Sequence, residues 1–315
     1  MNRLRFAPRA AAPAAMLLVV AAWLGGCGDP VSTRPLPSPA NPFAADSAGT
    51  DSTFDVATWN LHDFATSAGD TTVALVAQAI LALKLDVVAL QEVAEAQRFR
   101  DLLARLPGWT GTQATSNAYQ NLAFVWRTAT VTPGPEGIRE ILTGDARAFP
   151  RPPLAFDLVW RGHALLLVDN HLKCCGDGGL DVADAWDEET RRRDACVQLA
   201  GWLATSGAGR AAIVLGDLND LLTDAAPNNV FTAFLDHPEA YRFADMAVAT
   251  GPAAGWSWGP GQSHLDHLLV TAPLFAATSA PGSLCHTIRL DRSFPAYRSQ
   301  VSDHAPVVLR LDLDP

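Results

Sequence analysis

The stretch Ser263-His264-Leu265-Asp266-His267 opens an apolar segment near the end of the chain, and Ser302-Asp303-His304 precedes a second one. Each stretch joins an aspartate to a histidine where a strand-like run begins. A carboxylate beside a histidine orients the imidazole and stabilises its protonated form, as in many acid/base sites. We therefore interpret the two stretches as halves of one acid/base site, formed where strand ends meet.

Four further polar groups lie upstream, and each follows or interrupts a strand-like segment. They are Trp59-Asn60, Gln91-Glu92, Asn170-His171-Leu172-Lys173 and Gly216-Asp217-Leu218-Asn219-Asp220. Carboxylate, amide and histidine side chains brought together at strand ends are what metal-assisted attack on a phosphate ester requires. The pattern as a whole therefore indicates phosphate ester chemistry.

The spacing of apolar residues predicts an alternation of strands and helices around these groups. We expect strands at 54–59, 86–90, 122–126, 164–168, 211–215, 267–271 and 306–311, helices at 71–85, 98–106 and 184–205, and a break at 133–137.

In this order and with this spacing, the six polar groups resemble the endonuclease/exonuclease/phosphatase superfamily, which has a pancreatic-type deoxyribonuclease-like fold. The resemblance runs from about Phe54 to Leu313. It implies an α/β (α+β) fold, a four-layered α/β/β/α sandwich of two packed mixed sheets in a single catalytic domain. It also implies a metal-dependent hydrolase, but not its substrate, because one fold hosts many functions.

The resemblance assigns a metal site to Asn60 and Glu92, with Asp303 contacting metal-bound water. Oxygen ligands with few carboxylates suit Mg²⁺ or Mn²⁺ rather than zinc. Asp169 stands where family members often have an amide, so its role as a ligand stays open.

The catalytic residues implied by the resemblance are His304, whose imidazole Asp266 would orient, and His171, which would bind a phosphate oxygen. Asp217 and Asn219 match the pair that positions the nucleophile and the phosphate. Other side chains have more than one interpretation. His264 and His267 either reach the cleft or are strand residues, and Trp256 and Trp258 either stack a base, cover a lipid or cap the edge of a core.

The first 27 residues carry Arg3, Arg5 and Arg9, no acidic residue, and then an apolar run at 14–24, which predicts a secretory signal rather than a transmembrane helix. Leu24-Gly25-Gly26-Cys27 resembles a bacterial lipobox, which would lipidate Cys27; an ordinary signal peptide cut near that residue is the alternative. We expect a lipoprotein signal peptide at 1–27, a Pro-rich tether at 28–52 and the catalytic domain at 53–315. The expected location is the bacterial cell envelope, periplasmic or outer surface, with membrane contact through the lipid alone and a monomeric protein.

The net charge of −10 and the presence of only two lysines, Lys84 and Lys173, give no basic stripe. This argues against purely electrostatic binding of nucleic acid, although a bound metal supplies positive charge that such counting omits. Our first hypothesis is a phosphodiesterase acting on DNA or RNA, most simply an endonuclease. A phosphomonoesterase, a sphingomyelinase-type phospholipase and a catalytically silent binding lipoprotein are the alternatives.

Four cysteines follow Cys27 in the chain, an even number that suits an oxidising compartment. We expect a disulfide from Cys174 or Cys175 to Cys196 or Cys285. Cys196 also fits the apolar face of a helix, where a free buried cysteine is ordinary.

Overall fold

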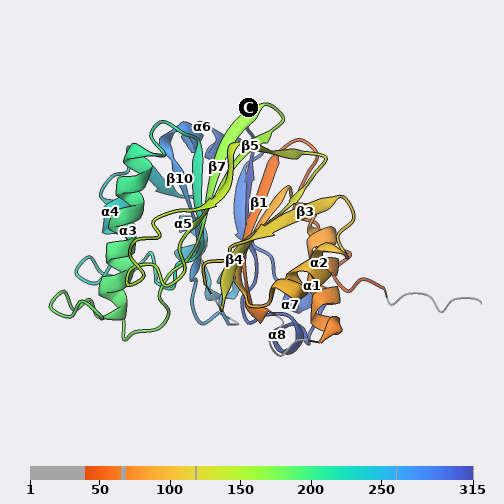
Figure 1. The fold of residues 1–315 in the computed structure, drawn as a ribbon, viewed down its shortest axis with the longest axis horizontal. Helices are drawn as coiled ribbons and strands as arrows, with labels where there is room; N and C mark the ends of the chain where they lie inside the picture. The colour runs from red at the N-terminus through yellow and green to blue at the C-terminus, as the bar shows by residue number, and fades with distance from the viewer. Residues whose placement is uncertain (1–39, 65–68, 118, 260, 315) are drawn as a thin grey trace, which may run out of the picture. The chain divides into compact units, whose positions relative to one another are not determined.

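The computed structural model describes residues 40–64, 69–117, 119–259 and 261–314, so the expected leader, Cys27 and the first part of the tether lie outside the described residues. Two six-stranded mixed sheets form the centre of the domain (Figure 1). The first sheet has the order β11 (Leu284–Thr287), β12 (Val307–Leu311), β1 (Phe54–Phe64), β2 (Val87–Val93), β4 (Asn121–Arg127) and β3 (Trp109–Gln113). The second has the order β5 (Val131–Glu140), β6 (Leu154–Trp160), β7 (His163–His171), β8 (Ala212–Asp217), β10 (Asp266–Thr271) and β9 (Tyr241–Phe243).

Eight helices among the described residues surround the two sheets, and the three longest cover the outer faces. The eight are α1 (Asp70–Leu83), α2 (Ala96–Leu103), α3 (Glu188–Thr205), α4 (Thr232–Leu235), α5 (Met246–Ala249), α6 (Phe275–Thr278), α7 (Leu290–Ser293) and α8 (Tyr297–Gln300), with 3-10 turns at Ala253–Gly255 and Ala272–Leu274. One apolar cluster fills the space between the sheets, a second joins the first sheet to α1 and α2, and a third joins the second sheet to α3. The predicted four-layered sandwich is therefore confirmed.

The predicted elements with clearly buried faces are confirmed. Helix α1 buries Val73, Val76, Ile80 and Leu83 on one face, and it ends where Lys84 takes a left-handed backbone conformation. Strands β8 and β10 are buried along their whole length, as strands in the middle of a covered sheet should be.

The largest departures from the predicted elements occur at the edges of the sheets. The expected break at 133–137 is wrong, because β5 continues through it with a shift in register between Pro133 and Ile138. Since β5 is an edge strand, a proline and a bulge there cost little pairing. Edge strands β3, β9 and β11 and the interior strand β6 were not predicted either. Helix α3 begins at Glu188, later than expected, where the Asp187 side chain accepts a hydrogen bond from the Thr190 amide.

Residues 40–52 belong to the compact domain, which begins at Ala40 rather than at residue 53. Phe43 is completely buried and meets Phe294 edge-on, with ring centroids 5.8 Å apart. The Ala48 amide donates to the Leu83 carbonyl over 3.1 Å. The expected tether is thus wrong for this part of the chain, because Phe43 and this hydrogen bond hold it against the domain. Among the described residues, no helix has the length and apolarity needed to cross a membrane.

Candidate active site

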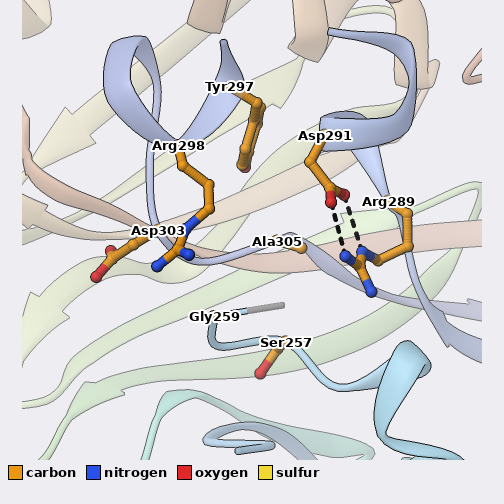
Figure 2. A pocket seen from close by; sticks show the side chains of 8 residues that line it. All are labelled: Ser257, Gly259, Arg289, Asp291, Tyr297, Arg298, Asp303 and Ala305. Carbon is orange, nitrogen blue, oxygen red and sulfur yellow. Dashed lines mark hydrogen bonds and ion pairs between the residues drawn. The ribbon is translucent and has the colours of Figure 1, made fainter. Parts of the chain in front are cut away.

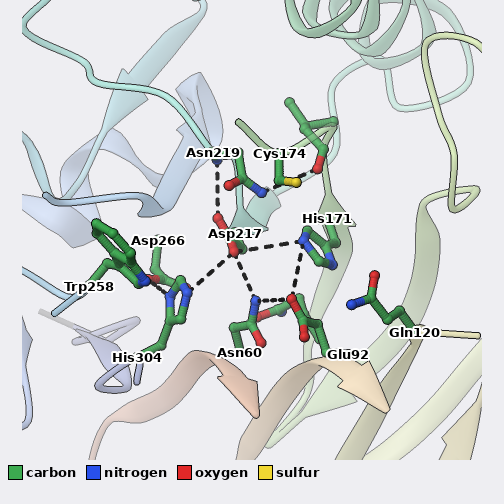
Figure 3. A network of polar contacts seen from close by, with 12 residues as sticks. Asn60, Glu92, Gln120, His171, Cys174, Asp217, Asn219, Trp258, Asp266 and His304 are labelled. Carbon is green, nitrogen blue, oxygen red and sulfur yellow. Dashed lines mark hydrogen bonds and ion pairs between the residues drawn. The ribbon is translucent and has the colours of Figure 1, made fainter. Parts of the chain in front are cut away.

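The site residues lie at strand ends that the pairing of the strands brings together. In the second sheet, β7 and β8 pair His171 with Asp217, and β8 and β10 pair Asp217 with Asp266. In the first sheet, β1 and β2 pair Asn60 with Gln91. The two sheets meet where Asn60 Nδ2 donates to Asp217 Oδ2 over 2.8 Å. Figure 3 shows the resulting network at the mouth between the sheets.

Glu92 is held from two sides at the end of β2. Its Oε1 accepts from Asn60 Nδ2 at 3.0 Å, and its Oε2 accepts from the Asp63 amide at 2.7 Å. The backbone φ of Glu92 is +59°, at a shift of register between Leu90 and Val93. A left-handed conformation is uncommon for residues other than glycine and concentrates at functional positions. The bulge turns the carboxylate towards Asn60 and the second sheet.

His304 and Asp266 form the expected pair, with 2.8 Å between His304 Nδ1 and Asp266 Oδ2. The other ring nitrogen, Nε2, lies 3.7 Å from Asp217 Oδ2. Burial lowers the pKa of His304, but the negative charges of Asp266 and Asp217 outweigh it and raise the pKa to about 10. The Tyr297 hydroxyl fixes the backbone here by donating to the His304 carbonyl over 2.6 Å.

Asp217 is the centre of the network. Burial raises its pKa to about 7, with Asp266 and Glu92 adding to the effect and His304 and the Asn60 amide opposing it. Its Oδ1 accepts from the Asn219 amide at 3.1 Å, and Asn219 has a φ of +56°. The Asn219 side chain in turn donates to the Leu172 carbonyl over 3.2 Å. Asp217 and Asn219 are therefore tied to each other and to the segment after His171.

His171 faces both carboxylates, with its Nε2 3.7 Å from Glu92 Oε1 and 3.8 Å from Asp217 Oδ2. Burial lowers the pKa of His171 well below its usual value, and the positive charges of Arg151 and His304 lower it further. The ring is therefore neutral at ordinary pH and can donate one hydrogen bond from Nε2.

Asp303 is placed differently from the other predicted metal residues, Asn60 and Glu92. Its Oδ1 lies 3.0 Å from His62 Nδ1, and its Oδ2 accepts from Trp258 Nε1 at 3.2 Å. It lines the same cleft as Glu92, Asp217 and His304. Asp303 thus makes its contacts at the cleft mouth, with His62 and Trp258 rather than with Glu92 or Asn60, which fits contact with the ion's water better than direct ligation.

The structure distinguishes between the interpretations that the sequence left open for several residues. Trp258 reaches the cleft, whereas His264 and His267 bond to the buried Asp245 on the other side of the strand. Asp169 Oδ1 accepts from Gln91 Nε2 at 2.7 Å, away from Glu92, and burial raises its pKa well above the usual value. Asp169 is therefore a buried core residue that does not line the cleft.

Arg151 interacts electrostatically with Glu92 and Asp217, a contact that the sequence did not reveal. It donates to the Gln120 side-chain oxygen, and Gln120 in turn donates to Asp63 Oδ1 over 2.6 Å. Burial lowers the pKa of Arg151, and the negative charges of Glu92 and Asp217 oppose the change. The residue comes from the segment before β6 rather than from a strand end, so the strand-end pattern could not find it.

The expected long-range disulfide is wrong, because Cys174, Cys175, Cys196 and Cys285 are all free. Cys196 is completely buried on the core face of α3, as the alternative interpretation had it. Cys174 and Cys175 lie at the rim of the cleft, with 2.8 Å between their sulfur atoms.

The cleft itself has a volume of about 600 Å³. Its carboxylates are Glu92, Glu189, Asp217, Asp220, Asp224 and Asp303. A smaller hollow next to Asp303 is lined by Tyr297, Arg298 and the ion pair of Arg289 with Asp291 (Figure 2). That hollow has a volume of about 10 Å³, which is room for about one water molecule, so of these two the larger cleft is the one that can hold a substrate.

The cleft fits a divalent cation. Glu92 and Asp217 share a single amide donor, Asn60 Nδ2, and each raises the electrostatic cost of the other's charge. Hard oxygen donors in excess of local positive charge are what Mg²⁺ and Mn²⁺ prefer. Asp217, Asp266 and His304 also place one ligand atom each within 4.8 Å of one another. Glu92 with Asn60 would hold the ion, next to the Asp217 carboxylate.

The model of the Endonuclease/Exonuclease/phosphatase family matches residues 57–304. The chain belongs to this family. It is therefore an enzyme, a metal-dependent phosphoesterase hydrolase, as the six polar groups predicted, and the alternative of a silent binding protein is set aside.

Solved structures show the same fold at low sequence identity. D. rerio TDP2, complexed with a single-strand DNA product, is 17% identical with a TM-score of 0.62, and the match covers 83% of this chain and 99% of that one. The human Nocturnin catalytic domain with a bound sulfate anion is 18% identical with a TM-score of 0.56, over 82% and 94% of the two chains. A mannosyl-6-phosphatase from Bacteroides thetaiotaomicron is 17% identical with a TM-score of 0.55, over 82% and 99%. No curated protein matches the chain.

Proposed function

We propose that this enzyme is a phosphodiesterase that uses Mg²⁺ or Mn²⁺ and cleaves nucleic acid, most simply as an endonuclease. The observation that carries the proposal is the convergence of Glu92, Asp217 and the His304/Asp266 pair at the base of one open cleft. The bound ion would neutralise charge on the phosphate oxygens.

The residues of the site have the other roles in the reaction. Glu92 and Asn60 hold the ion, and Asn219 and neutral His171 donate hydrogen bonds to the phosphate. The proton of the attacking water passes to the Asp217/His304 pair, whose facing atoms are 3.7 Å apart. With the ion bound, the pKa of both groups would be lower, so the pair would be unprotonated and able to accept this proton. Asp266 keeps the His304 ring in place.

A diester fits the charges of the cleft better than a monoester does. Arg192 is the arginine that lines the cleft, and it is already paired with Glu189 and Asp220 at 3.1 and 2.8 Å. Lys173 lies 3.6 Å from Glu188. A phosphomonoester carries nearly two negative charges and would need free cations among these carboxylates, whereas a diester carries one.

Nucleic acid is supported by Trp258, an aromatic surface at the cleft on which a base can stack. The similar D. rerio protein was solved with a DNA product. A lipid phosphodiester is the second candidate, favoured by one observation: Val182 and Trp186 are 65% and 66% exposed on the segment between β7 and α3, part of which forms the cleft rim.

We also propose that the chain is attached to the bacterial cell envelope through lipid on Cys27, which the leader and the lipobox support. Cys27→Ser should release the protein into the soluble fraction. Retention of the Cys27→Ser protein in carbonate-washed membranes would contradict the anchor.

The test of the activity is hydrolysis by the purified protein of single-stranded DNA, double-stranded DNA, RNA, sphingomyelin and a sugar monophosphate, with Mg²⁺ or Mn²⁺ and with EDTA. We expect cleavage of a nucleic acid that stops in EDTA and returns with the ion. Glu92→Gln should abolish it, while Glu95→Gln, the same substitution at an exposed position three residues on, should not. Hydrolysis of only sphingomyelin or only the monophosphate would replace the proposed substrate class.

A further inference from the structure

A second histidine/aspartate group lies behind the cleft, on the opposite face of β10. It consists of Asp245, His264 and His267, which are at most 2% exposed and do not line the cleft. Because side chains alternate along a strand, Asp266 points to the active site and its neighbour His267 points to the core below α4 and β9. The enzyme therefore has two histidine/aspartate pairs on adjacent residues of one strand.

Hydrogen-bond geometry fixes the protons of His267. Its Nε2 lies 2.9 Å from the Asp220 carbonyl oxygen, which can only accept, so Nε2 carries a hydrogen. Its Nδ1 lies 2.6 Å from Asp245 Oδ2. That oxygen also faces His264 Nε2 at 3.0 Å, and Oδ1 accepts from the Leu268 amide at 2.9 Å. Asp245 is thus a carboxylate surrounded by donors, and His267 donates from both nitrogens.

The bond from His267 ends on the loop that carries two site residues. Asp220 closes the segment that begins at Asp217, and it directly follows Asn219, whose φ is +56°. The Asp220 side chain is held separately, by Arg192 Nε at 2.8 Å. His267 therefore fixes the main chain of this loop from behind, and Arg192 fixes its side chain.

Packing alone does not explain a charged pair at this position. His267 is enclosed by Phe231 and Phe243, with ring centroids 5.6 and 6.0 Å away. Removing two charges from water costs several kcal/mol per ion, and apolar replacements of buried ion pairs are often as stable or more so. An aromatic ring would fill the same space, so the directional bond to the Asp220 carbonyl is what the histidine adds.

We propose that His267, oriented by Asp245, is a positioning residue that sets the conformation of the Asp217–Asp220 loop and so aims Asn219 and Asp217 at the phosphate. The inference rests on the proposed function for the roles of Asn219 and Asp217. Its structural part, the hold on the loop, can be measured without any substrate.

Two substitutions separate the two bonds of His267. In His267→Gln the amide nitrogen stands near the position of Nε2 and can still donate to the Asp220 carbonyl. In His267→Asn it stands near Nδ1 and can donate only to Asp245. We expect His267→Asn to lower kcat by roughly 10- to 100-fold, a typical effect of losing a partner behind a site, with KM nearly unchanged, and His267→Gln to restore most of it.

A double-mutant cycle tests the route of the effect. If His267 acts through the loop, Asn219→Ala should reduce kcat much less in the His267→Asn protein than in the wild type. Amide hydrogen exchange at residues 217–221 should be faster in His267→Asn than in His267→Gln. Asp245→Asn, which keeps the side-chain shape, should show the same changes to a smaller degree. It provides a second test of the proposal if the His267→Asn protein does not fold.

Equal kcat in the Asn and Gln variants, or full additivity with Asn219→Ala, would overturn the proposal. So would unchanged exchange at 217–221 in His267→Asn and Asp245→Asn. If the wild type hydrolyses no phosphodiester but the exchange differs as expected, the proposed function fails and the hold on the loop stands.

Discussion

The Asp266/His304 pair and the Asp245/His267 pair use the same chemical groups on opposite faces of β10, yet their surroundings give them different tasks. His304 is tied on one side only, since its Nε2 is 3.7 Å from Asp217 and can exchange a proton with a ligand in the cleft. His267 is tied on both sides, to Asp245 and to the Asp220 carbonyl. A histidine with a free nitrogen next to an open cleft is suited to chemistry, and one with none is suited to holding the chain.

The largest effect should come from the cleft itself. Glu92→Gln and His304→Asn should each lower kcat/KM on the order of 10³-fold, because one removes the charge that holds the ion and the other removes a member of the proton-accepting pair. The double variant should be little worse than either single one, since both act on one step. Steady-state kinetics measures this, with Glu95→Gln as the control. A residual rate within tenfold of wild type in His304→Asn would place the chemistry elsewhere.

The next prediction compares substitutions of the two aspartates, Asp266 and Asp245. Asp266→Asn should lower kcat by about 10²-fold while leaving the thermal unfolding temperature close to that of the wild type, because it loosens the ring that takes part in proton transfer. Asp245→Asn should lower the unfolding temperature more, because it leaves His267 buried with a weaker partner.

Kinetics and thermal unfolding of the same two preparations give the comparison. If Asp245→Asn lowered kcat more than Asp266→Asn did, the distinction between a pair that takes part in the reaction (Asp266/His304) and a holding pair that fixes the main chain (Asp245/His267) would be wrong.

The sequence predicted the cleft pair well because strand ends and motif order carry that information. Asn60, Glu92, His171, Asp217, Asp266 and His304 meet as expected, since parallel and antiparallel pairing carries each strand end to the same edge. These positions need no knowledge of loops. For the same reason seven of the eight interior strands were found, whereas the interior strand β6, whose end carries no polar group of this kind, and the four edge strands were not. Three of the edge strands, β3, β9 and β11, have only three to five residues.

The parts that the sequence did not reveal depend on contacts between distant segments. Arg151 comes from an irregular segment, and its place among carboxylates exists only after folding. Asp245 follows a three-residue strand, so no pattern in the nearby sequence identifies it as the partner of His267. Phe43 lies among prolines that favour a tether, and its burial against Phe294 depends on a segment far along the chain.

The smallest effect concerns how the stability provided by the Asp245/His267 pair changes with pH. Burial raises the pKa of Asp245, but His267 and His264 outweigh it and hold the pKa well below the usual range. The pair therefore contributes fully above about pH 3.8, the unfolded value of an aspartate, and loses that contribution as the pH falls further. Burial also lowers the pKa of His267, but Asp245 outweighs it and raises the pKa above the usual value. This contribution is complete below about pH 6.5 and is lost as the pH rises through the raised pKa.

The difference in the free energy of unfolding between the wild type and Asp245→Asn, called the gap below, should therefore be largest between about pH 4 and pH 6.5. It should be smaller below and above this range. Urea unfolding of the two proteins at a series of pH values measures the gap, and Asp266→Asn provides a control in which the holding pair is intact. A gap that widens steadily towards alkaline pH would mean that His267 is neutral in the folded protein. In that case its bond to Asp245 would be an ordinary hydrogen bond, and the contrast with the cleft pair would rest on burial alone.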